Sequence, residues 1–246
     1  IIYQILTLHK APITKFTLDI VHLESSPDVD NFIYFLSRND IQHLVLHFSL
    51  RHIYKLPSSV FTCSQLRHLS LYYCSIHHLP DFKGFNNLIS LEICEVEISA
   101  ELLESLIAHC PLLEKLELDI EDNSDTIEIN APMLRFFDLT GNISSICLKN
   151  VPRLVKLFLN GDYIEAEELD FAKVFKSCPA LEHLLFNFLL SGFSAREGYE
   201  VPARLPFNLN SVKRFYLSDI SLVKSYKLSY ALCLIRSFPC LEYLEI

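Results

Sequence analysis

Ten histidines and eight cysteines are the side chains in this sequence best suited to metal or thiol chemistry. Cys74, followed by the adjacent pair His77 and His78, comes nearest to a set of metal ligands. Structural zinc sites normally carry paired Cys or His at short spacing. This sequence contains no Cys-x-x-Cys, and two neighbouring histidines are not spaced as ligands on one helix face. We therefore expect no metal site and no cofactor.

Catalytic and nucleotide-binding motifs also find no support in the sequence. A cysteine nucleophile needs a lowered pKa and a nearby base, and no local motif points to such a pair. No window matches Gly-x-x-x-x-Gly-Lys-Ser/Thr or Gly-x-Gly-x-x-Gly. A lone glycosylation triplet, Asn142-Ile143-Ser144, is expected by chance in this length. We expect no catalytic residue, no cofactor-binding residue and no enzymatic activity.

Composition indicates a folded chain with a well-filled core. Half of the 246 residues are hydrophobic and 21% are charged. The net charge of −9 disfavours nucleic acid and anionic membrane surfaces as partners, and no apolar run approaches the ~20 residues of a membrane span. Eight Cys in a chain of this size indicate reduced, mostly buried thiols, hence a cytoplasmic or nuclear protein. Because the first residue is not Met, we expect a fragment or trimmed chain.

An internal repeat explains how the chain positions its side chains. The phrase Leu-x-x-Leu-x-Leu, with other apolar residues allowed, recurs ten times at intervals of 20 to 31 residues. Its occurrences are Ile13–Leu18, Ile41–Leu46, Leu66–Leu71, Leu88–Ile93, Leu113–Leu118, Leu134–Leu139, Leu154–Leu159, Leu181–Phe186, Val212–Leu217 and Leu241–Ile246. Stacked units of this kind bury a continuous core. The pattern predicts an α/β leucine-rich-repeat solenoid of about ten repeats, as a single domain over residues 1–246, with a curved parallel sheet on the concave side and helices and irregular turns on the convex side.

Proline and cysteine mark the same phase independently. Five Pro precede the first apolar position of a repeat by two residues, and three Cys precede it by three residues. They are Pro111, Pro132, Pro152, Pro179 and Pro239, with Cys63, Cys110 and Cys178. Because Pro lacks an N–H and disfavours helix before it, we expect it to end the returning segment and to admit the chain to a strand at the strand's first residue.

Several segments between the predicted strands read as helices with one apolar face. They are Asp30–Arg38, a segment capped by Ser99, Glu167–Lys176 and Tyr226–Arg236. The shortest intervals leave no room for a helix, so Ile127–Ile129 and Ile146–Leu148 are predicted as extra strands. The stretch Ser191–Pro206 is predicted as a surface loop or insertion.

The sequence of the repeats resembles that of the plant F-box/FBD/LRR-repeat proteins. The resemblance lies in residues 3–20 (YQILTLHKAPITKFTLDI), 56–71 (LPSSVFTCSQLRHLSL), 82–91 (FKGFNNLISL) and 103–118 (LESLIAHCPLLEKLEL). It implies the substrate-recognition region of an F-box subunit of a cullin-based ubiquitin ligase. In that family an F-box docks onto a Skp-type adaptor and the repeats recruit the target. No F-box or FBD region is found in this sequence, so the adaptor would dock only through an F-box absent from this chain.

Residues that alternate with the leucines are predicted to face outward on the concave side, where a target protein would bind. One predicted row is basic and aromatic, and the next has an acidic middle with aromatic anchors. The candidate binding residues are Lys115, Glu117, Phe136, Asp138, Lys156, Phe158, His183, Arg214 and Tyr216. A solvated face with weakly paired charges is the competing interpretation.

Three other functions compete with the ubiquitin-ligase interpretation. Leu66–Leu71 followed by Leu79-Pro80 is also similar to the repeat region of intracellular plant immune receptors. A hydrolase or metal enzyme would need stoichiometric metal or a catalytic motif. An extracellular receptor would carry a Gly-x-Ile-Pro phrase, which this sequence lacks.

Overall fold

The computed structural model describes most of the chain and divides it into two compact units. The described residues are 11–20, 27–49, 53–80, 82–120, 126–161, 163–165, 170–187, 192–194, 200–218 and 225–246. The first unit comprises residues 1–117 and the second residues 118–246. The sequence-based expectation of one domain stays a prediction.

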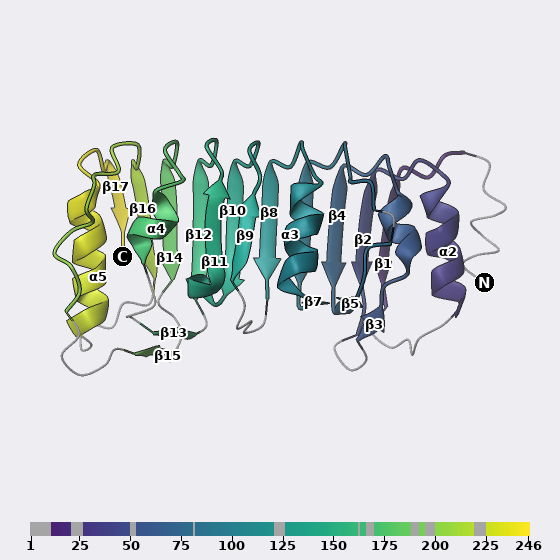
Figure 1. Ribbon diagram of the computed structural model, residues 1–246, viewed down its shortest axis with the longest axis horizontal. Helices are drawn as coiled ribbons and strands as arrows, with labels where there is room; N and C mark the ends of the chain where they lie inside the picture. Colours follow the sequence, from purple (N-terminus) through teal and green to yellow (C-terminus); the bar gives the residue numbers. More distant parts are fainter. Residues whose placement is uncertain are drawn as a thin grey trace. The chain divides into compact units, whose positions relative to one another are not determined.

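All ten predicted strands are present and belong to a parallel sheet (Figure 1). In the first unit their order is β1 (Lys15–Asp19), β2 (His43–His47), β4 (His68–Tyr72), β6 (Ser90–Cys94) and β8 (Lys115–Asp119), and the boundary between the units falls within β8. In the second unit the order is β10 (Phe136–Gly141), β12 (Lys156–Gly161), β14 (His183–Asn187), β16 (Arg214–Ser218) and β17 (Tyr243–Glu245). The predicted α/β architecture of ten repeats is confirmed.

The leucine phrases set both the start and the register of these strands. Every strand begins at the residue just before the second apolar position of its phrase. Leu44 is in register with Leu69 and Leu69 with Leu91, and in the second unit Leu157 is in register with Leu184. These side chains are at most 1% exposed. The buried spine, called the Leu ladder below, therefore leaves the alternate residues of each strand on the opposite sheet face.

The prolines mark a turn that precedes the strand. The carbonyl of Cys110 accepts from the N–H of Leu113 at 3.1 Å, and that of Cys178 from Leu181 at 3.2 Å. Pro111 and Pro179 directly follow these cysteines, so each occupies the second position of a turn, where a fixed φ is favourable. The expectation that Pro is the first residue of the strand is wrong, because β8 begins only at Lys115.

The cysteines at this turn are buried, as expected from the sequence. The Sγ of Cys110 lies 3.1 Å from the carbonyl oxygen of Leu106, and the Sγ of Cys178 lies 3.5 Å from that of Val174. Burial raises the pKa of both thiols to about 12. All eight cysteines are free thiols; six are buried, Cys94 is partly exposed and Cys240 is exposed.

Helices connect several of the strands on the side of the sheet that the Leu ladder faces. They are α2 (Pro27–Ser37), α3 (Ala100–Ala108), α4 (Phe171–Phe175) and α5 (Ser225–Ser237), with 3₁₀ turns η1 (Ser58–Thr62) and η2 (Ile143–Ser145). Ser99 caps α3 by accepting the N–H of Leu102 at 3.3 Å, as predicted. The helix predicted over Glu167–Lys176 is observed only as α4, which Asp170 caps, and residues 166–169 lie outside the described residues.

Short strands form the remaining connections. β3 (Tyr54–Lys55), β5 (Cys74–Ile76) and β7 (Glu97–Ile98) pair in the first unit. In the second unit β9 (Ile127–Asn130) pairs with β11 (Ile146–Asn150), which confirms both predicted extra strands. The predicted loop Ser191–Pro206 contains β15 (Gly192–Ser194), which pairs with β13 (Tyr163–Glu165), and Leu205 is only 7% exposed. The loop prediction is wrong for Gly192–Ser194, and Leu205 lies in a loop but is buried and not at the surface. Residues 191 and 195–199 lie outside the described part.

Candidate partner-binding face

The sheet face opposite the Leu ladder, here called the outer face, presents three rows of side chains in the second unit. Strand register aligns the members of each row across neighbouring strands. The first row is Phe136, Lys156, His183, Arg214 and Tyr243. The second is Asp138, Phe158, Leu185, Tyr216 and Glu245, and the third is Thr140, Asn160, Asn187 and Ser218. Seven of the nine predicted binding residues thus lie on one face of one unit.

The first row places basic side chains on three successive strands. Lys156 and Arg214 are exposed, and His183 between them is partly exposed. The ion pairs formed by described residues include neither Lys156 nor Arg214. The neighbouring Lys213 is paired instead, with its Nζ 3.6 Å from the Oε1 of Glu182. The middle of the row is therefore a positive strip without a described carboxylate partner.

The surroundings of His183 lower the pKa of its imidazole. Partial burial lowers its pKa below the ordinary value of 6.5, and the charges of Arg214 and Lys156 lower it further. Glu182 acts in the opposite direction, but the net shift is downward. The imidazole is therefore mainly neutral near pH 7, and a carboxylate placed beside it raises its pKa.

Partly exposed apolar side chains form the centre of the second row. Phe158, Leu185 and Tyr216 lie on neighbouring strands, and none of them is fully buried. The ring of Phe158 contacts that of Phe136 edge-on, with centroids 5.2 Å apart. The Tyr216 and Tyr243 rings lie 5.4 Å apart. Aromatic contacts of this kind hold the rings in place and leave one side available for a partner.

Asp138 points toward the third row. Its Oδ1 accepts a hydrogen bond from Asn160 at 3.1 Å, which directs the carboxylate along the strand axis. The third row is not among the predicted binding residues, although the same alternation, continued two residues along each strand, predicts it. The row adds neutral amide and hydroxyl groups beside the apolar centre.

The two remaining predicted residues, Lys115 and Glu117, lie on β8 in the first unit. Their side chains form an ion pair of 2.6 Å with each other, with exposed fractions of 47% and 25%. Glu92 on the adjoining strand accepts from the hydroxyl of Ser70 at 2.9 Å and also bonds Tyr72. Burial first, and then the hydrogen bond and charge of Glu92, raise the pKa of Tyr72. The carboxylates in the middle of this face are thus already engaged by neighbouring side chains.

Histidines of the first unit also contact each other or a neighbouring side chain. The rings of His43 and His68 stack with centroids 4.3 Å apart. Burial, followed by nearby His43, Arg67 and lysine charges, lowers the pKa of His68. At the far end of the strands the Nδ1 of His47 lies 3.5 Å from the Oδ1 of Asp19, and its ring contacts Tyr72.

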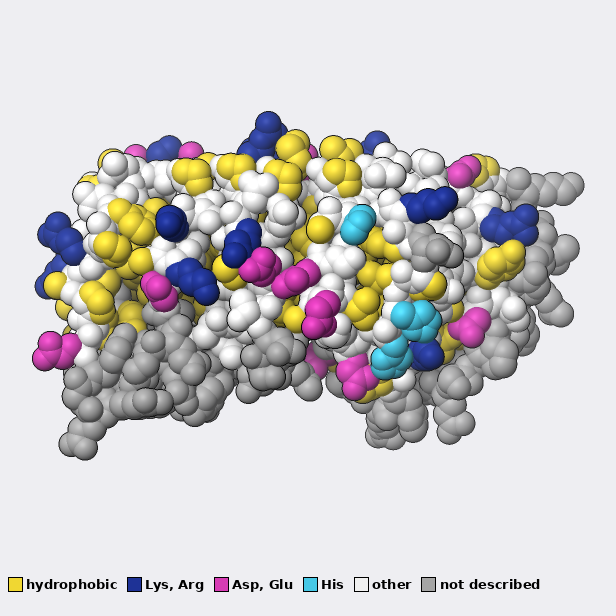
Figure 2. Space-filling model, in the orientation of Figure 1, with side chains coloured by type: hydrophobic (Ala, Val, Ile, Leu, Met, Phe, Trp, Pro, Cys, Tyr) yellow, Lys and Arg dark blue, Asp and Glu magenta, His cyan; other side chains and the backbone are white. Residues whose placement is uncertain are grey.

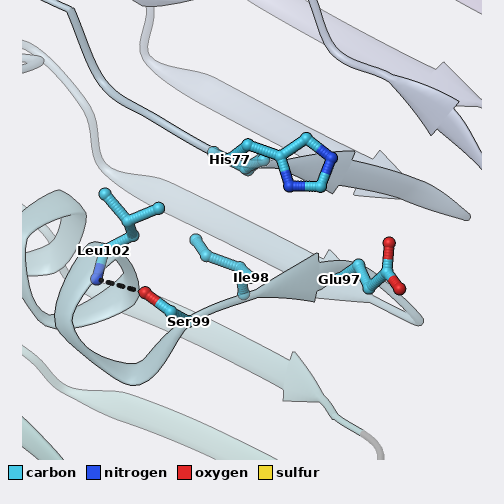
Figure 3. Close-up of a pocket in the computed structure, with 6 residues that line it drawn as sticks. His77, Glu97, Ile98, Ser99 and Leu102 are labelled. Atoms are coloured by element: carbon cyan, nitrogen blue, oxygen red, sulfur yellow. Dashed lines mark hydrogen bonds between the residues drawn. The ribbon is translucent and has the colours of Figure 1, made fainter.

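His77, one of the residues considered for metal binding, lines a shallow pocket on the helix side of the first unit (Figure 3). Cys74 is fully buried, and burial raises its pKa to about 12, so it serves as a core thiol. The Nε2 of His77 lies 3.3 Å from the Oγ of Ser75, but Ser75 is only 3% exposed, which keeps its hydroxyl from a substrate. The Oγ of Ser99 accepts a hydrogen bond from the N–H of Leu102. Among the described residues no group of three or more His, Cys, Asp or Glu is placed to hold a metal ion.

A second basic surface lies on the helix side of the second unit. Figure 2 shows basic side chains gathered over α4 and β11. A shallow pocket there is lined by Lys149, Lys173 and Lys176 with Asn150 and Ser177. Lys149 is paired with Glu128 at 3.0 Å, whereas Lys173 and Lys176 are exposed. This surface provides an internal comparison for the outer face.

The repeated strands, the buried leucine spine and the outer face define a leucine-rich-repeat protein, a class that binds other proteins. Residues 29–246 match the family model described as FBD-associated F-box protein At5g56370, LRR repeats. The chain belongs to this family. Among the described residues, every helix is too short or too polar to cross a bilayer.

Two curated relatives from Arabidopsis thaliana are similar to the chain. The F-box/FBD/LRR-repeat protein At1g13570 is 31% identical over 98% of this chain and 59% of its own length. The F-box/FBD/LRR-repeat protein At5g56570 is 29% identical over 52% of this chain and 28% of its own length. The chain thus spans less than two thirds of the relatives it matches, and among the alternatives the comparisons support the F-box family.

Proposed function

We propose that the chain is the substrate-recognition region of an F-box subunit of a cullin-based ubiquitin ligase. Family membership supports this role, because both curated relatives are F-box/FBD/LRR-repeat proteins. In the full-length protein an F-box docks onto a Skp-type adaptor, and the repeats hold the target protein. The reduced, mostly buried thiols agree with work in the cytoplasm or nucleus.

The outer face of the second unit carries the argument for target binding. It combines exposed cations with partly exposed aromatic and aliphatic side chains in a fixed register. Arg, Tyr and other aromatic side chains dominate the energetics of protein interfaces. Rigid strands hold these groups at fixed spacing, so little conformational entropy is lost when a partner binds.

Affinity purification of the full-length protein tests both parts of this proposal. The wild-type protein is expected to co-purify a Skp-type adaptor, a cullin and ubiquitinated target proteins. The double variant Phe158→Ala/Tyr216→Ala should retain the adaptor and lose the targets, because these two side chains lie on the outer face and outside the Leu ladder. Absence of the adaptor from the wild-type purification would refute the ligase role, and unchanged target capture by the variant would refute the assigned face.

A further inference from the structure

We propose that the outer face of the second unit binds an acidic, extended segment of the target protein. Carboxylates of that segment contact Lys156 and Arg214, and its apolar side chains pack on Phe158, Leu185 and Tyr216. This inference rests on the proposed function and names the partner chemistry of that same face.

Charge on this face points to an acidic partner. The chain carries a net charge of −9, yet the centre of the first row is basic and has no described carboxylate partner. The turns leading into β10, β12 and β16 add Arg135, Arg153 and Lys213, of which Lys213 is paired. A basic strip within an acidic protein attracts acidic segments, whereas the negatively charged remainder of the surface repels them.

The spacing of the two rows fits an extended chain lying between them. Neighbouring strands are ~4.8 Å apart, so the backbones at Lys156 and Arg214 are separated by roughly 10 Å. Successive side chains of an extended peptide point to opposite sides, with same-side residues ~7 Å apart. A segment that crosses the strands between the rows therefore directs alternate residues to the basic row and to the apolar row. The same-side residues of the peptide are ~7 Å apart, whereas the backbones at Lys156 and Arg214 are roughly 10 Å apart. The long side chains of Lys156 and Arg214 span this difference.

The recognition rule that follows is an alternation of acidic and apolar residues. Acidic residues face Lys156, His183 and Arg214, while apolar residues face Phe158, Leu185 and Tyr216. The lysines on the helix side lack this pairing, because their pocket is formed by α4, β11 and two prolines and presents no strand register. A simple charge attraction would use both surfaces equally, whereas the alternation rule selects the outer face.

Fluorescence anisotropy with the purified chain and a short labelled peptide of alternating Glu and Phe or Leu tests the proposal. We expect saturable binding that weakens as salt rises, since exposed charges are screened. Lys156→Glu/Arg214→Glu should weaken binding by at least about tenfold, because two attractive contacts become repulsive. Lys173→Glu/Lys176→Glu changes the net charge equally within the same unit and should change the affinity by less than about twofold.

Two matched peptides separate register from charge. One has Gln in place of every Glu, and the other has the same composition with all Glu grouped at one end. Both should bind at least about tenfold more weakly than the alternating peptide. Equal binding of all three peptides, equal losses in both double variants, or a larger loss in Lys173→Glu/Lys176→Glu would each overturn the proposal. Circular dichroism of the variants shows whether the fold is retained, and Lys156→Gln/Arg214→Gln, which only neutralises the strip, gives a second and milder test.

This measurement is independent of the ligase assembly. If the peptide fails to bind while the full-length protein captures targets through Phe158 and Tyr216, the partner chemistry is wrong and the proposed function stands. If the peptide binds but no Skp-type adaptor co-purifies, the ligase role fails and the peptide-binding face stands.

Discussion

The outer faces of the two units are built on the same strand register but differ in how their charges are engaged. In the first unit Glu117 pairs with Lys115, Glu92 bonds Ser70 and Tyr72, and Asp19 lies beside His47. In the second unit Lys156 and Arg214 have no described carboxylate partner and lie beside partly exposed Phe158 and Tyr216.

The comparison shows how a repeat scaffold separates stability from recognition. The Leu ladder is buried in both units, so the inward positions are fixed by the core. The outward positions are free to vary because they contribute little to the core. A face whose charges engage one another has little to gain from a partner, whereas a face with unpaired cations beside apolar groups gains from an acidic and apolar one.

The largest expected effect comes from the Leu ladder, which both units share. Leu69→Ala in the first unit and Leu157→Ala in the second each remove a fully or almost fully buried side chain of the ladder. Each should lower the free energy of unfolding by about 2–5 kcal/mol, as measured by urea denaturation. The adjacent face variants Ser70→Ala and Phe158→Ala are the controls and should cost less than about 1.5 kcal/mol. A tolerated Leu substitution in either unit would contradict the common spine.

A second experiment converts the face of the second unit into that of the first. Phe158 follows Lys156 by two residues on β12, as Glu117 follows Lys115 on β8. Phe158→Glu should therefore pair with Lys156 and remove an apolar contact at once. We expect it to weaken binding of the alternating acidic peptide by more than about tenfold, or at least 1.4 kcal/mol. Phe158→Gln removes the ring without adding charge and should lose less, so equal losses would show that the free cation is unimportant.

The strands and their outward rows could be predicted from the sequence nearly residue by residue. The apolar phrase fixes which residues face the core, and Pro111 or Pro179 fixes where each turn lies. Which neighbour each charged side chain pairs with could not be predicted. Residue type places a side chain in a row but does not set its rotamer. Asp138, for example, accepts a hydrogen bond from Asn160, which lies in a row that the predicted binding residues did not include.

The short connecting strands were the second feature that could not be predicted from the sequence. β13 and β15 are three residues long and are far apart in sequence, so neither produces a periodic signal. Their pairing depends on how the main sheet brings the two segments together. The residues of β13 and β15 alone do not encode this pairing. The longer helix α3, with Ser99 as its cap and a clear apolar face, was predictable because both signals are local.

A smaller effect should come from His183. Its pKa is lowered by burial, Arg214 and Lys156, opposed by Glu182, and lowered slightly by Lys213. Bound carboxylates should raise this pKa, so the complex takes up a proton and the affinity for the acidic peptide increases as pH falls. From about pH 7.5 to about pH 5.5 we expect a gain of a few fold in anisotropy titrations. His183→Gln should remove this dependence and His68→Gln, in the first unit, should preserve it; the reverse pattern would place the peptide on the first unit.

The smallest effect tests whether the first face is satisfied by its own side chains. Glu92→Gln removes the charge that faces Tyr72 and weakens the bond from Ser70. The pKa of Tyr72 should fall, while remaining above its ordinary value because burial is the larger cause of its shift. Absorbance titration against the Tyr72→Phe variant isolates this one tyrosine.

The same Glu92→Gln variant should lose only about 0.5 kcal/mol of stability, since a single side-chain hydrogen bond is weakened, not removed, at a partly exposed site. Its affinity for the acidic peptide should equal that of the wild type, because Glu92 belongs to the first unit. A marked gain in peptide binding would mean that the first face repels acidic segments only through this carboxylate. In that case the two faces would differ by one charge and not by their aromatic residues.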